Sequence, residues 1–177
     1  LQRPISAIID QPQYPQESIM GIPVCQGQVA RQQQVVLALG NNDARQQAFK
    51  HWRSCLLPDN LRHPSAYIDD CVEMGIANQL LAFSMLGPNV SLGKANIINS
   101  YAVVEHETII GDFNHLAPGA KLLGRSKIAD RCFIGANAVV REGVSVCSDV
   151  VIGAQAYVSA DINQPGVYVG IPARKSN

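Results

Sequence analysis

A histidine between two glutamates is the clearest chemical signal in this sequence. His106 is flanked by Glu105 and Glu107. A carboxylate beside an imidazole increases the basicity of the ring and holds it in one orientation, which is what a general base needs. The competing interpretation is an ordinary surface histidine in an acidic patch, and these three residues do not decide between the two.

Two further residues follow His106 at sequence spacings that could bring them to the same site. His115 follows it by nine residues and Gly124 by 18. A glycine stacked beside a base leaves room for a substrate, and its exposed N–H could stabilise an oxyanion. Gly124 also suits a simple corner, and His115 could either reach the same groove or cap a turn. The other two histidines, His51 in a predicted helix and His63 before a proline, are predicted to be structural.

A six-residue repeat determines how these side chains are positioned. Every sixth residue is Ile, Leu, Val or Met, at Ile68, Met74, Leu80, Leu86, Leu92, Ile98, Val104, Ile110, Leu116, Leu122, Ile128, Ile134, Val140, Val146, Ile152 and Val158. Four places later the side chain is mostly small, as at Ala102, Thr108, Ala120, Ser126, Cys132, Ala138 and Ala156. This pattern is typical of a left-handed parallel β-helix, in which three hexads make one triangular coil of about 18 residues. We therefore expect about five coils, with glycine and asparagine near the corners, and His106 stacked on Gly124.

Residues 1–60 follow a different pattern, so we predict two domains, 1–60 and 61–177. Apolar runs at 5–9 and 35–39 predict buried strands, and 21–24 predicts a turn. The glutamine-rich stretch 26–34 and the segment from Asn41 to near Pro58 predict helices, the second with an Asn-Asn-Asp N-terminal cap. Strand, helix, strand and helix together predict a small Rossmann-like α/β unit with parallel strands.

The composition excludes several classes of protein. The chain has 14 Lys+Arg and 14 Asp+Glu, which argues against nucleic acid or an anionic membrane as partner. No apolar run approaches the roughly 18 residues of a spanning helix. The five cysteines, Cys25, Cys55, Cys71, Cys132 and Cys147, show no CxxC spacing and are predicted to be reduced, buried residues of a cytoplasmic protein.

The hexads, the stretch from Ile98 through Glu107 and the closing Gly-Ile-Pro-Ala-Arg at 170–174 resemble the bacterial left-handed β-helix sugar acetyltransferases. The branch that contains UDP-N-acetylbacillosamine N-acetyltransferase and sialic acid O-acetyltransferase is the most similar, because a Rossmann-like domain precedes its β-helix. The Gly40-Asn41-Asn42 step followed by Arg45 fits that domain. That branch usually opens with a strand and a Gly-rich loop, and the start at Leu1 leads us to expect that this segment is missing from the chain.

The resemblance implies a set of functional residues. His106 would be the general base and Glu107 would tune it. The thioester end of acetyl-CoA would contact His115 and the main chain of Gly124, and the pantetheine arm would pass Ala136 and Ala154. The acceptor would lie near Asn99, with its nucleotide or sugar held by Asp10, Gln11 and Gly40. Gln11 stands where an acidic residue is common, which weakens any assignment of the acceptor.

The function implied is transfer of an acetyl group from acetyl-CoA to the amine of a nucleotide-linked 4-amino sugar of the UDP type, in bacterial glycan biosynthesis. The resemblance also implies a homotrimer with the acetyl-CoA groove between two prisms, in the cytoplasm and without a metal. Two alternatives remain open at this point. One is O-acetylation of sialic acid or a related sugar hydroxyl, which uses the same base. The other is a different class, either a non-catalytic solenoid or a zinc carbonic anhydrase, although that enzyme needs three histidines where the repeat contains only two.

Overall fold

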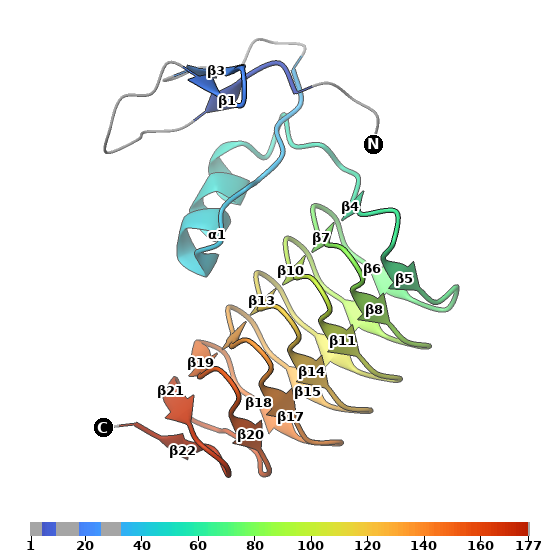
Figure 1. The fold of residues 1–177 in the computed structure, drawn as a ribbon, viewed down its shortest axis with the longest axis vertical. Helices are drawn as coiled ribbons and strands as arrows, with labels where there is room; N and C mark the ends of the chain where they lie inside the picture. The colour runs from blue at the N-terminus through green and yellow to red at the C-terminus, as the bar shows by residue number, and fades with distance from the viewer. Residues whose placement is uncertain (1–4, 10–17, 26–32, 177) are drawn as a thin grey trace.

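The computed structural model describes residues 5–9, 18–25 and 33–176 of the 177-residue chain. A β-solenoid begins at Leu61 and extends to the C-terminal end of the described chain (Figure 1). The described residues before Leu61 form a smaller part, which we call the leader, and its helix lies alongside one face of the solenoid. No helix within the described residues has the length and apolar character needed to cross a membrane.

Three sheets form the sides of the solenoid. Sheet I consists of β4 (Leu61–Arg62), β7 (Gln79–Leu80), β10 (Ile97–Ile98), β13 (His115–Leu116), β16 (Phe133–Ile134), β19 (Val150–Ile152), β21 (Gly166–Val169) and β22 (Arg174–Lys175). Sheet II consists of β5 (Tyr67–Ile68), β8 (Met85–Leu86), β11 (Val103–Val104), β14 (Lys121–Leu122), β17 (Val139–Val140) and β20 (Tyr157–Val158). Sheet III consists of β6 (Glu73–Met74), β9 (Ser91–Leu92), β12 (Ile109–Ile110), β15 (Lys127–Ile128) and β18 (Ser145–Val146). We name the corners by the sheets that they join: I–II, II–III and III–I.

The predicted coil of 18 residues is confirmed by the strand register. Ile97 pairs in parallel with His115, and Val103 pairs with Lys121. Each offset is one coil, and three short strands complete it, which is consistent with the predicted left-handed β-helix. The solenoid begins with β4 at Leu61, where the second domain was predicted to begin and one hexad before Ile68, the first position counted in the repeat. It continues into β21 and β22 after the last predicted hexad.

The aliphatic row forms the core of the solenoid, as predicted. From Leu80 to Val158 every member of the row is buried, while Ile68 and Met74 are partly buried against the same cluster. The small residues predicted beside them are also buried; Ala102, Thr108 and Cys132 are 0% exposed. A narrow prism has no room for larger side chains here, so one aliphatic and one small residue per hexad suffice to fill it.

Glycine and asparagine were expected at the turns, and this is correct only in part. The left-handed residue stands three places after the aliphatic row. Gly119, Gly143, Asn89 and Asn137 fit the expectation, but the other residues at this position are Ala77, Phe83, Ala95, Tyr101, Glu107, Phe113, Arg125, Arg131, Asp149 and Gln155. A side chain there costs about 1–2 kcal/mol. A hydrogen bond to the preceding coil offsets that cost, as from the Glu107 N–H to the Pro88 carbonyl at 2.9 Å. Position 93 requires glycine for a different reason, namely that two successive coils approach each other closely there. A β-carbon at Gly93 would lie 2.5 Å from the Gly111 carbonyl oxygen.

The leader differs from the predicted α/β unit in several places. Strand β1 (Ile8–Ile9) pairs in parallel with β3 (Ile22–Cys25), and β2 (Ser18–Ile19) pairs with β3 in the opposite direction. The turn predicted at 21–24 is therefore wrong, because a strand occupies most of it. The strand predicted at 35–39 is reduced to a single parallel bridge between Val35 and Leu56. Most of the helix predicted at 26–34 lies outside the described residues.

Helix α1 (Asn42–His51) begins where the sequence predicts and ends earlier than predicted. The Asn41 side chain accepts the N–H of Ala44 at 2.9 Å, which caps the helix N-terminus. Asp43 in the first turn and Lys50 in the last turn suit the helix dipole. After His51 the chain turns back, and Leu56 forms a parallel bridge with Val35. The chain then enters the solenoid at Leu61.

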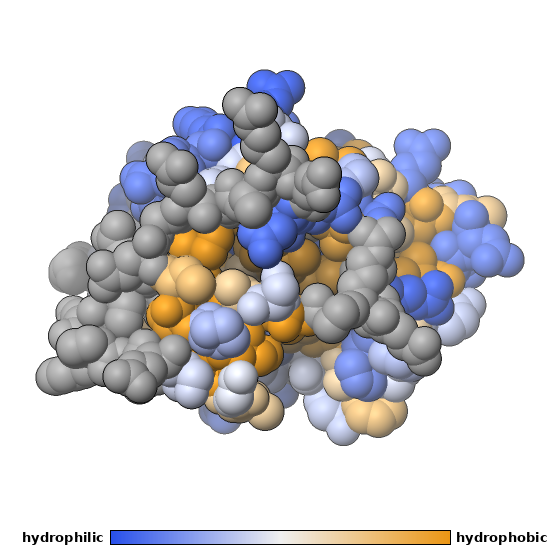
Figure 2. Space-filling view, turned by 90° about the horizontal axis from the view of Figure 1, so that it is seen from above, coloured by the Kyte–Doolittle hydropathy of each residue, from blue (hydrophilic) through white to orange (hydrophobic). Residues whose placement is uncertain are grey.

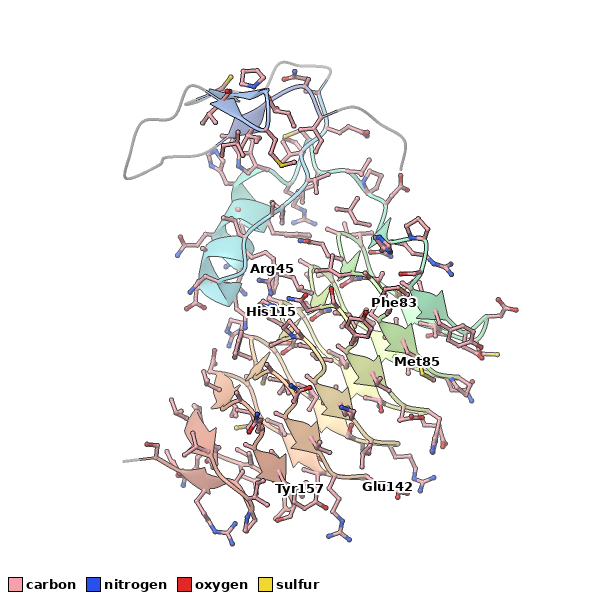
Figure 3. All side chains as sticks on the ribbon, in the orientation of Figure 1. Arg45, Phe83, Met85, His115, Glu142 and Tyr157 are labelled. Carbon is pink, nitrogen blue, oxygen red and sulfur yellow. The ribbon has the colours of Figure 1, made fainter. Side chains whose placement is uncertain are left out.

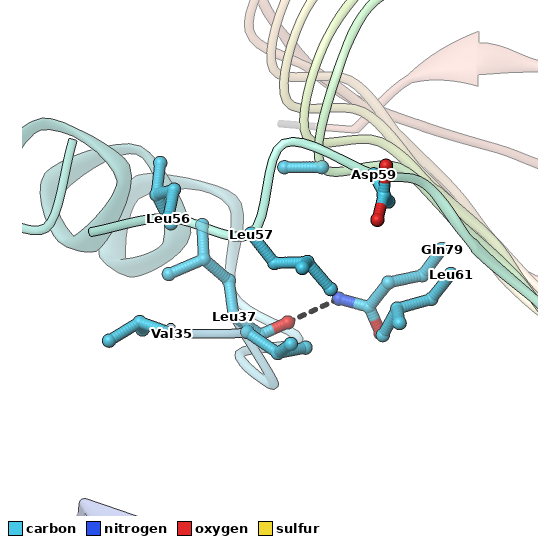
Figure 4. Close-up of a pocket in the computed structure, with 9 residues that line it drawn as sticks. Val35, Leu37, Leu56, Leu57, Asp59, Leu61 and Gln79 are labelled. Carbon is cyan, nitrogen blue, oxygen red and sulfur yellow. Dashed lines mark hydrogen bonds between the residues drawn. The ribbon is translucent and has the colours of Figure 1, made fainter. Parts of the chain in front are cut away.

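The leader packs on the III–I corner and on sheet I. Phe49 of α1 meets the corner residue Phe113 edge to face, with ring centroids 5.5 Å apart, and both are buried. Beside them, Leu37, Leu57 and Leu61 surround a small cavity, where the Gln79 side chain donates to the Leu37 carbonyl (Figure 4). Hydrophobic side chains also gather in the middle of the surface at the leader end of the molecule (Figure 2).

The cysteine prediction is confirmed only in part. All five cysteines are free, but Cys25 and Cys71 are exposed, and only Cys132 is buried. Burial raises the pKa of the Cys132 thiol to about 11, so it stays protonated as a small core residue. Cys25 lies on the small three-stranded sheet and Cys71 at a turn, and neither position belongs to the aliphatic core.

Candidate active site

The II–III corner after β11 presents His106 and Glu107 side by side. Val104 points into the core, and the following residues leave the sheet, so their side chains turn outwards. The imidazole Nδ1 lies 3.0 Å from the Glu107 carboxylate Oε2. Because an ionised carboxylate only accepts, Nδ1 carries the hydrogen, and in the neutral ring Nε2 holds the lone pair. The ring therefore has the tautomer that a general base at Nε2 requires.

Gly124 lies one coil further along the same corner, directly against that nitrogen. A β-carbon at position 124 would lie 2.5 Å from Nε2 and 2.6 Å from Cε1 of His106. A side chain fits there only if the His106 ring moves aside, so the stacking predicted from the 18-residue spacing is confirmed. Within the described residues the Gly124 N–H donates to no acceptor, whereas the next N–H, of Arg125, donates to the His106 carbonyl at 2.9 Å. One unpaired donor thus stands beside the proposed base.

Charged side chains continue the corner beyond Glu107. Arg125 lies 3.6 Å from Glu107 Oε2, and it also pairs with Glu142 on the next coil. The side chains of His106, Glu107, Arg125 and Glu142 are each roughly half exposed. Water therefore screens the pairs, and their contribution to the free energy of unfolding is small. Their effect is to hold the Glu107 carboxylate in place beside the imidazole.

His115 stands on sheet I rather than at this corner, and both of its ring nitrogens have partners. Nδ1 lies 3.1 Å from the Gly40 carbonyl of the leader, and Nε2 lies 3.2 Å from the Asn99 amide nitrogen. Its ring meets Phe133 edge to face at 5.2 Å. The pKa of His115 is lowered mainly by burial. The Gly40 hydrogen bond raises the pKa in part, and the positive charge of Arg45 lowers it further.

A groove of about 530 Å³ opens beside His115, between the start of α1 and sheet I. Its lining residues are Gly40, Asn41, Asn42, Asp43, His115, Arg131, Phe133, Asp149 and Val151. Arg131 and Asp149 form a two-point ion pair across neighbouring coils, with both N–O distances at 2.7 Å. The pair lowers the pKa of Asp149 and raises that of Arg131. The groove thus combines polar side chains with one aromatic and one aliphatic wall, which suits a sugar or a nucleotide.

The residues singled out in the sequence fall on two different corners. His106, Glu107 and Gly124 share the II–III corner. Ala136 and Ala154 lie one coil apart at the I–II corner, and Asn99 lies at the edge of sheet I that leads to it. Gly40 lies beside His115, whereas Asp10 and Gln11 are outside the described residues. Within one chain, sheet II separates the proposed base from the second group.

Arg45 is the residue whose structural importance the sequence analysis missed. It is 0% exposed and lies between α1 and the III–I corner. The signal that could have revealed it is the helical spacing of Arg45 with Phe49 and Trp52, which places all three on the inward face. Within the described residues, no group of three or more His, Cys, Asp or Glu side chains is placed to hold a metal ion.

Comparison with known proteins places this geometry in context. The family model "Hexapeptide repeat of succinyl-transferase" matches residues 127–160. The GDP-perosamine N-acetyltransferase of Escherichia coli O157:H7 is 32% identical over 112 residues, which are 61% of this chain and 49% of that protein. The match thus spans about half the length of that curated relative.

Two solved structures are similar over nearly the whole chain. The acetyltransferase domain of PglB from Neisseria gonorrhoeae, in complex with acetyl coenzyme A, is 27% identical, with a TM-score of 0.87 over 96% of this chain and 86% of that one. PerB from Caulobacter crescentus, in complex with CoA and GDP-perosamine, is 28% identical, with a TM-score of 0.86 over 91% and 82%. The resemblance to the left-handed β-helix sugar acetyltransferases is therefore confirmed.

Proposed function

We propose that this chain, as a relative of the left-handed β-helix sugar acetyltransferases, transfers an acetyl group from acetyl-CoA to the amine of a nucleotide-linked amino sugar. The observation that carries the proposal is the placement of His106 Nε2 over Gly124, with Nδ1 held by Glu107. Two relatives support the substrate class, since PerB was solved with CoA and GDP-perosamine and the PglB domain with acetyl coenzyme A. A 4-amino sugar linked to UDP is the acceptor that we infer, in bacterial glycan biosynthesis in the cytoplasm.

The chemistry follows from two polar groups at the II–III corner. The sugar amine attacks the thioester carbonyl while His106 Nε2 takes a proton from the nitrogen, so that the C–N bond forms without a cationic intermediate. We propose that the Gly124 N–H, which has no acceptor among the described residues, donates to the oxyanion that develops on the carbonyl. The C–S bond then breaks, the CoA thiolate leaves, and the proton on His106 returns to it. No covalent intermediate on the chain is needed.

A trimer would bring the two halves of the site together. The outward residues of sheet II are mostly apolar, namely Tyr67, Met85, Val103, Val139 and Tyr157, with Lys121 among them. Figure 3 shows Met85 and Tyr157 on this side, with Phe83 at the neighbouring corner. We propose that three sheets II pack around a three-fold axis. The II–III corner of one copy, with His106, would then face the I–II corner of the next, with Asn99, Ala136 and Ala154.

The leader is proposed to hold the acceptor, as the Rossmann-like domain does in the resembling branch. Gly40 supports this role because it lines the groove beside His115, and Asp10 and Gln11 remain part of the proposal. His115 and Gly124 are proposed to contact the thioester end of acetyl-CoA. Since His115 Nδ1 is engaged by Gly40 and Nε2 by Asn99, a polar contact from the ring would require one of these bonds to exchange.

The test is acetyl-CoA turnover by the purified chain with UDP-, GDP- and dTDP-linked 4-amino sugars and with free sialic acid. Release of CoA is followed with a thiol reagent, and the product is identified by mass spectrometry. We expect CoA release that depends on an amino sugar and yields an N-acetylated product. Release with a hydroxyl acceptor alone would refute N-acetylation in favour of the O-acetyl alternative.

A further inference from the structure

Arg45 is a fully buried cation whose charge is stabilised by hydrogen bonds to neutral carbonyl oxygens. Its guanidinium donates to main-chain carbonyls at Ala95, Leu39, Gly40, Phe113 and Asn114 over 2.8 to 3.2 Å, and to Asn42 Oδ1 at 2.7 Å. Burial lowers the pKa of Arg45 to about 10, which still leaves it charged at neutral pH. A buried charge is costly unless its donors are fully used, and here six acceptors use them.

These acceptors come from two different parts of the chain. Leu39 and Gly40 belong to the loop that leads into α1, and Asn42 is the first residue of that helix. Ala95, Phe113 and Asn114 belong to two successive coils at the III–I corner. Arg45 therefore fastens the loop that begins the leader helix to the solenoid, and Figure 3 shows its side chain close to His115, between α1 and the coils.

The Gly40 carbonyl links Arg45 to His115. It accepts from Arg45 Nη1 at 3.2 Å and from His115 Nδ1 at 3.1 Å. A carbonyl only accepts, so Nδ1 of His115 must carry a hydrogen. On the other side of the ring, the Asn99 Oδ1 accepts the Ser100 N–H at 2.8 Å, which orients the amide so that its nitrogen faces His115 Nε2.

We propose that Arg45 is a positioning residue that holds the Gly40 carbonyl against His115 Nδ1, and so fixes the neutral ring in one tautomer, with its hydrogen on Nδ1 and Nε2 accepting from Asn99. Protonation would place an N–H of the ring against an N–H of Asn99, which is repulsive. The charged groups around His115 are Arg45 behind Gly40 and, across the groove, Asp43, Arg131 and Asp149. The last two are paired with each other, and Arg45 is the one that contacts a hydrogen-bond partner of the ring.

The consequence for catalysis rests on the proposed function. A neutral His115 with a fixed ring keeps the Asn99 amide turned towards it, at the position inferred for the acceptor. Loss of Arg45 would free the loop, allow the other tautomer and misplace Asn99. Misplacement of such groups by about 1 Å lowers turnover by up to about a hundredfold.

The experiment uses the whole chain labelled with ¹⁵N-histidine, and His115 is identified by the signal that His115→Asn removes. Long-range ¹H–¹⁵N spectra report the tautomer, and a pH series reports the titration. We expect the Nδ1–H tautomer in the wild type, with titration below 6.5. Arg45→Lys keeps the charge but cannot reach all six acceptors. We expect a mixture of tautomers in this variant, because the Gly40 carbonyl is no longer held against Nδ1. Arg53→Lys, an exposed change in the same segment, is the matched control.

Unchanged His115 spectra in a folded Arg45→Lys protein would overturn the proposal. If Arg45→Lys does not fold, Asn42→Ala replaces it, because this change removes one of the six acceptors. We expect a smaller change in the tautomer population of His115 in the same direction. No change in that population would also overturn the proposal. A wild type that shows the Nδ1–H tautomer but no acetyl transfer would refute the proposed function and leave this inference standing.

Discussion

The imidazole of His106 occupies the space in which a side chain at position 124 would lie, with Nε2 only 2.5 Å from where a β-carbon of that residue would stand. The two residues are 18 positions apart, so they meet because one coil brings the same corner round again. Because residue 124 has no side chain, nothing from this position blocks the Nε2 atom of the proposed base. Among the described residues, the Gly124 N–H also has no acceptor. This relationship makes position 124 the sharpest point at which to test the site.

Gly124→Ala should abolish most of the turnover without unfolding the chain. The added methyl must push the His106 ring aside, and the ring can move because its side chain is 43% exposed. We expect kcat to fall about tenfold to a hundredfold, with little change in melting temperature. In a double-mutant cycle, Gly124→Ala should add nothing in a His106→Ala background. Additive losses would show that Gly124 acts independently of the histidine.

Glu107→Gln tests the carboxylate that holds His106 Nδ1 at 3.0 Å. The substitution keeps the shape of the side chain and removes its charge, so the hydrogen bond that orients the ring becomes weaker. We expect kcat to fall by about tenfold, against roughly a hundredfold or more for His106→Ala. Glu142→Gln, at the same corner on a neighbouring coil, should leave kcat near the wild-type value. Steady-state kinetics decide, and equal losses in the two glutamine variants would indicate a general effect of charge.

The stability of the chain should depend on the protonation of His115. Its pKa is lower in the folded chain than the ordinary value of 6.5, so the unfolded chain binds more protons in the interval between the two. This contribution is fully present above pH 6.5 and is lost as the pH falls through the folded value. We expect the melting temperature of the wild type to fall across this range and that of His115→Asn to fall less. At pH 8 His115 is neutral in both the folded and the unfolded chain. Any difference in melting temperature between the wild type and His115→Asn at that pH therefore does not come from titration.

Phe49→Ala should loosen the leader while the solenoid stays folded. The ring packs on Phe113 and is 7% exposed, so truncation leaves a cavity at the junction. A loss of about 3 kcal/mol is expected for such a change. Limited proteolysis should then cut the leader first, followed by a resistant solenoid fragment. Simultaneous loss of both parts would mean that the two fold as one cooperative unit.

Removal of metal should leave the acetyl transfer unchanged. The proposed reaction uses an imidazole and a main-chain N–H, and neither requires a bound cation. We expect the chain treated with EDTA to retain its turnover and elemental analysis to find no stoichiometric zinc. One zinc per chain together with hydration of carbon dioxide would instead revive the carbonic anhydrase alternative.

The solenoid and its II–III corner could be predicted from the sequence because both depend on a local period. Each hexad repeats one aliphatic and one small position, and the 18-residue coil follows by counting, so the contact between His106 and Gly124 was available in advance. The leader could not be predicted as well. Its strands are short and obtain their stability from packing, so the apolar run at 35–39 forms only one bridge, with Leu56.

The sequence by itself determined the coil, its core and the pairing of His106 with Glu107, since these depend on residues that are neighbours in the chain or one period apart. Only the tertiary structure decided where the leader sits. The contacts of Arg45 and His115 join residues 50 to 75 positions apart, with no period to announce them. A buried guanidinium is stable only where several carbonyls converge, and that convergence exists only once the helix has docked on the coils.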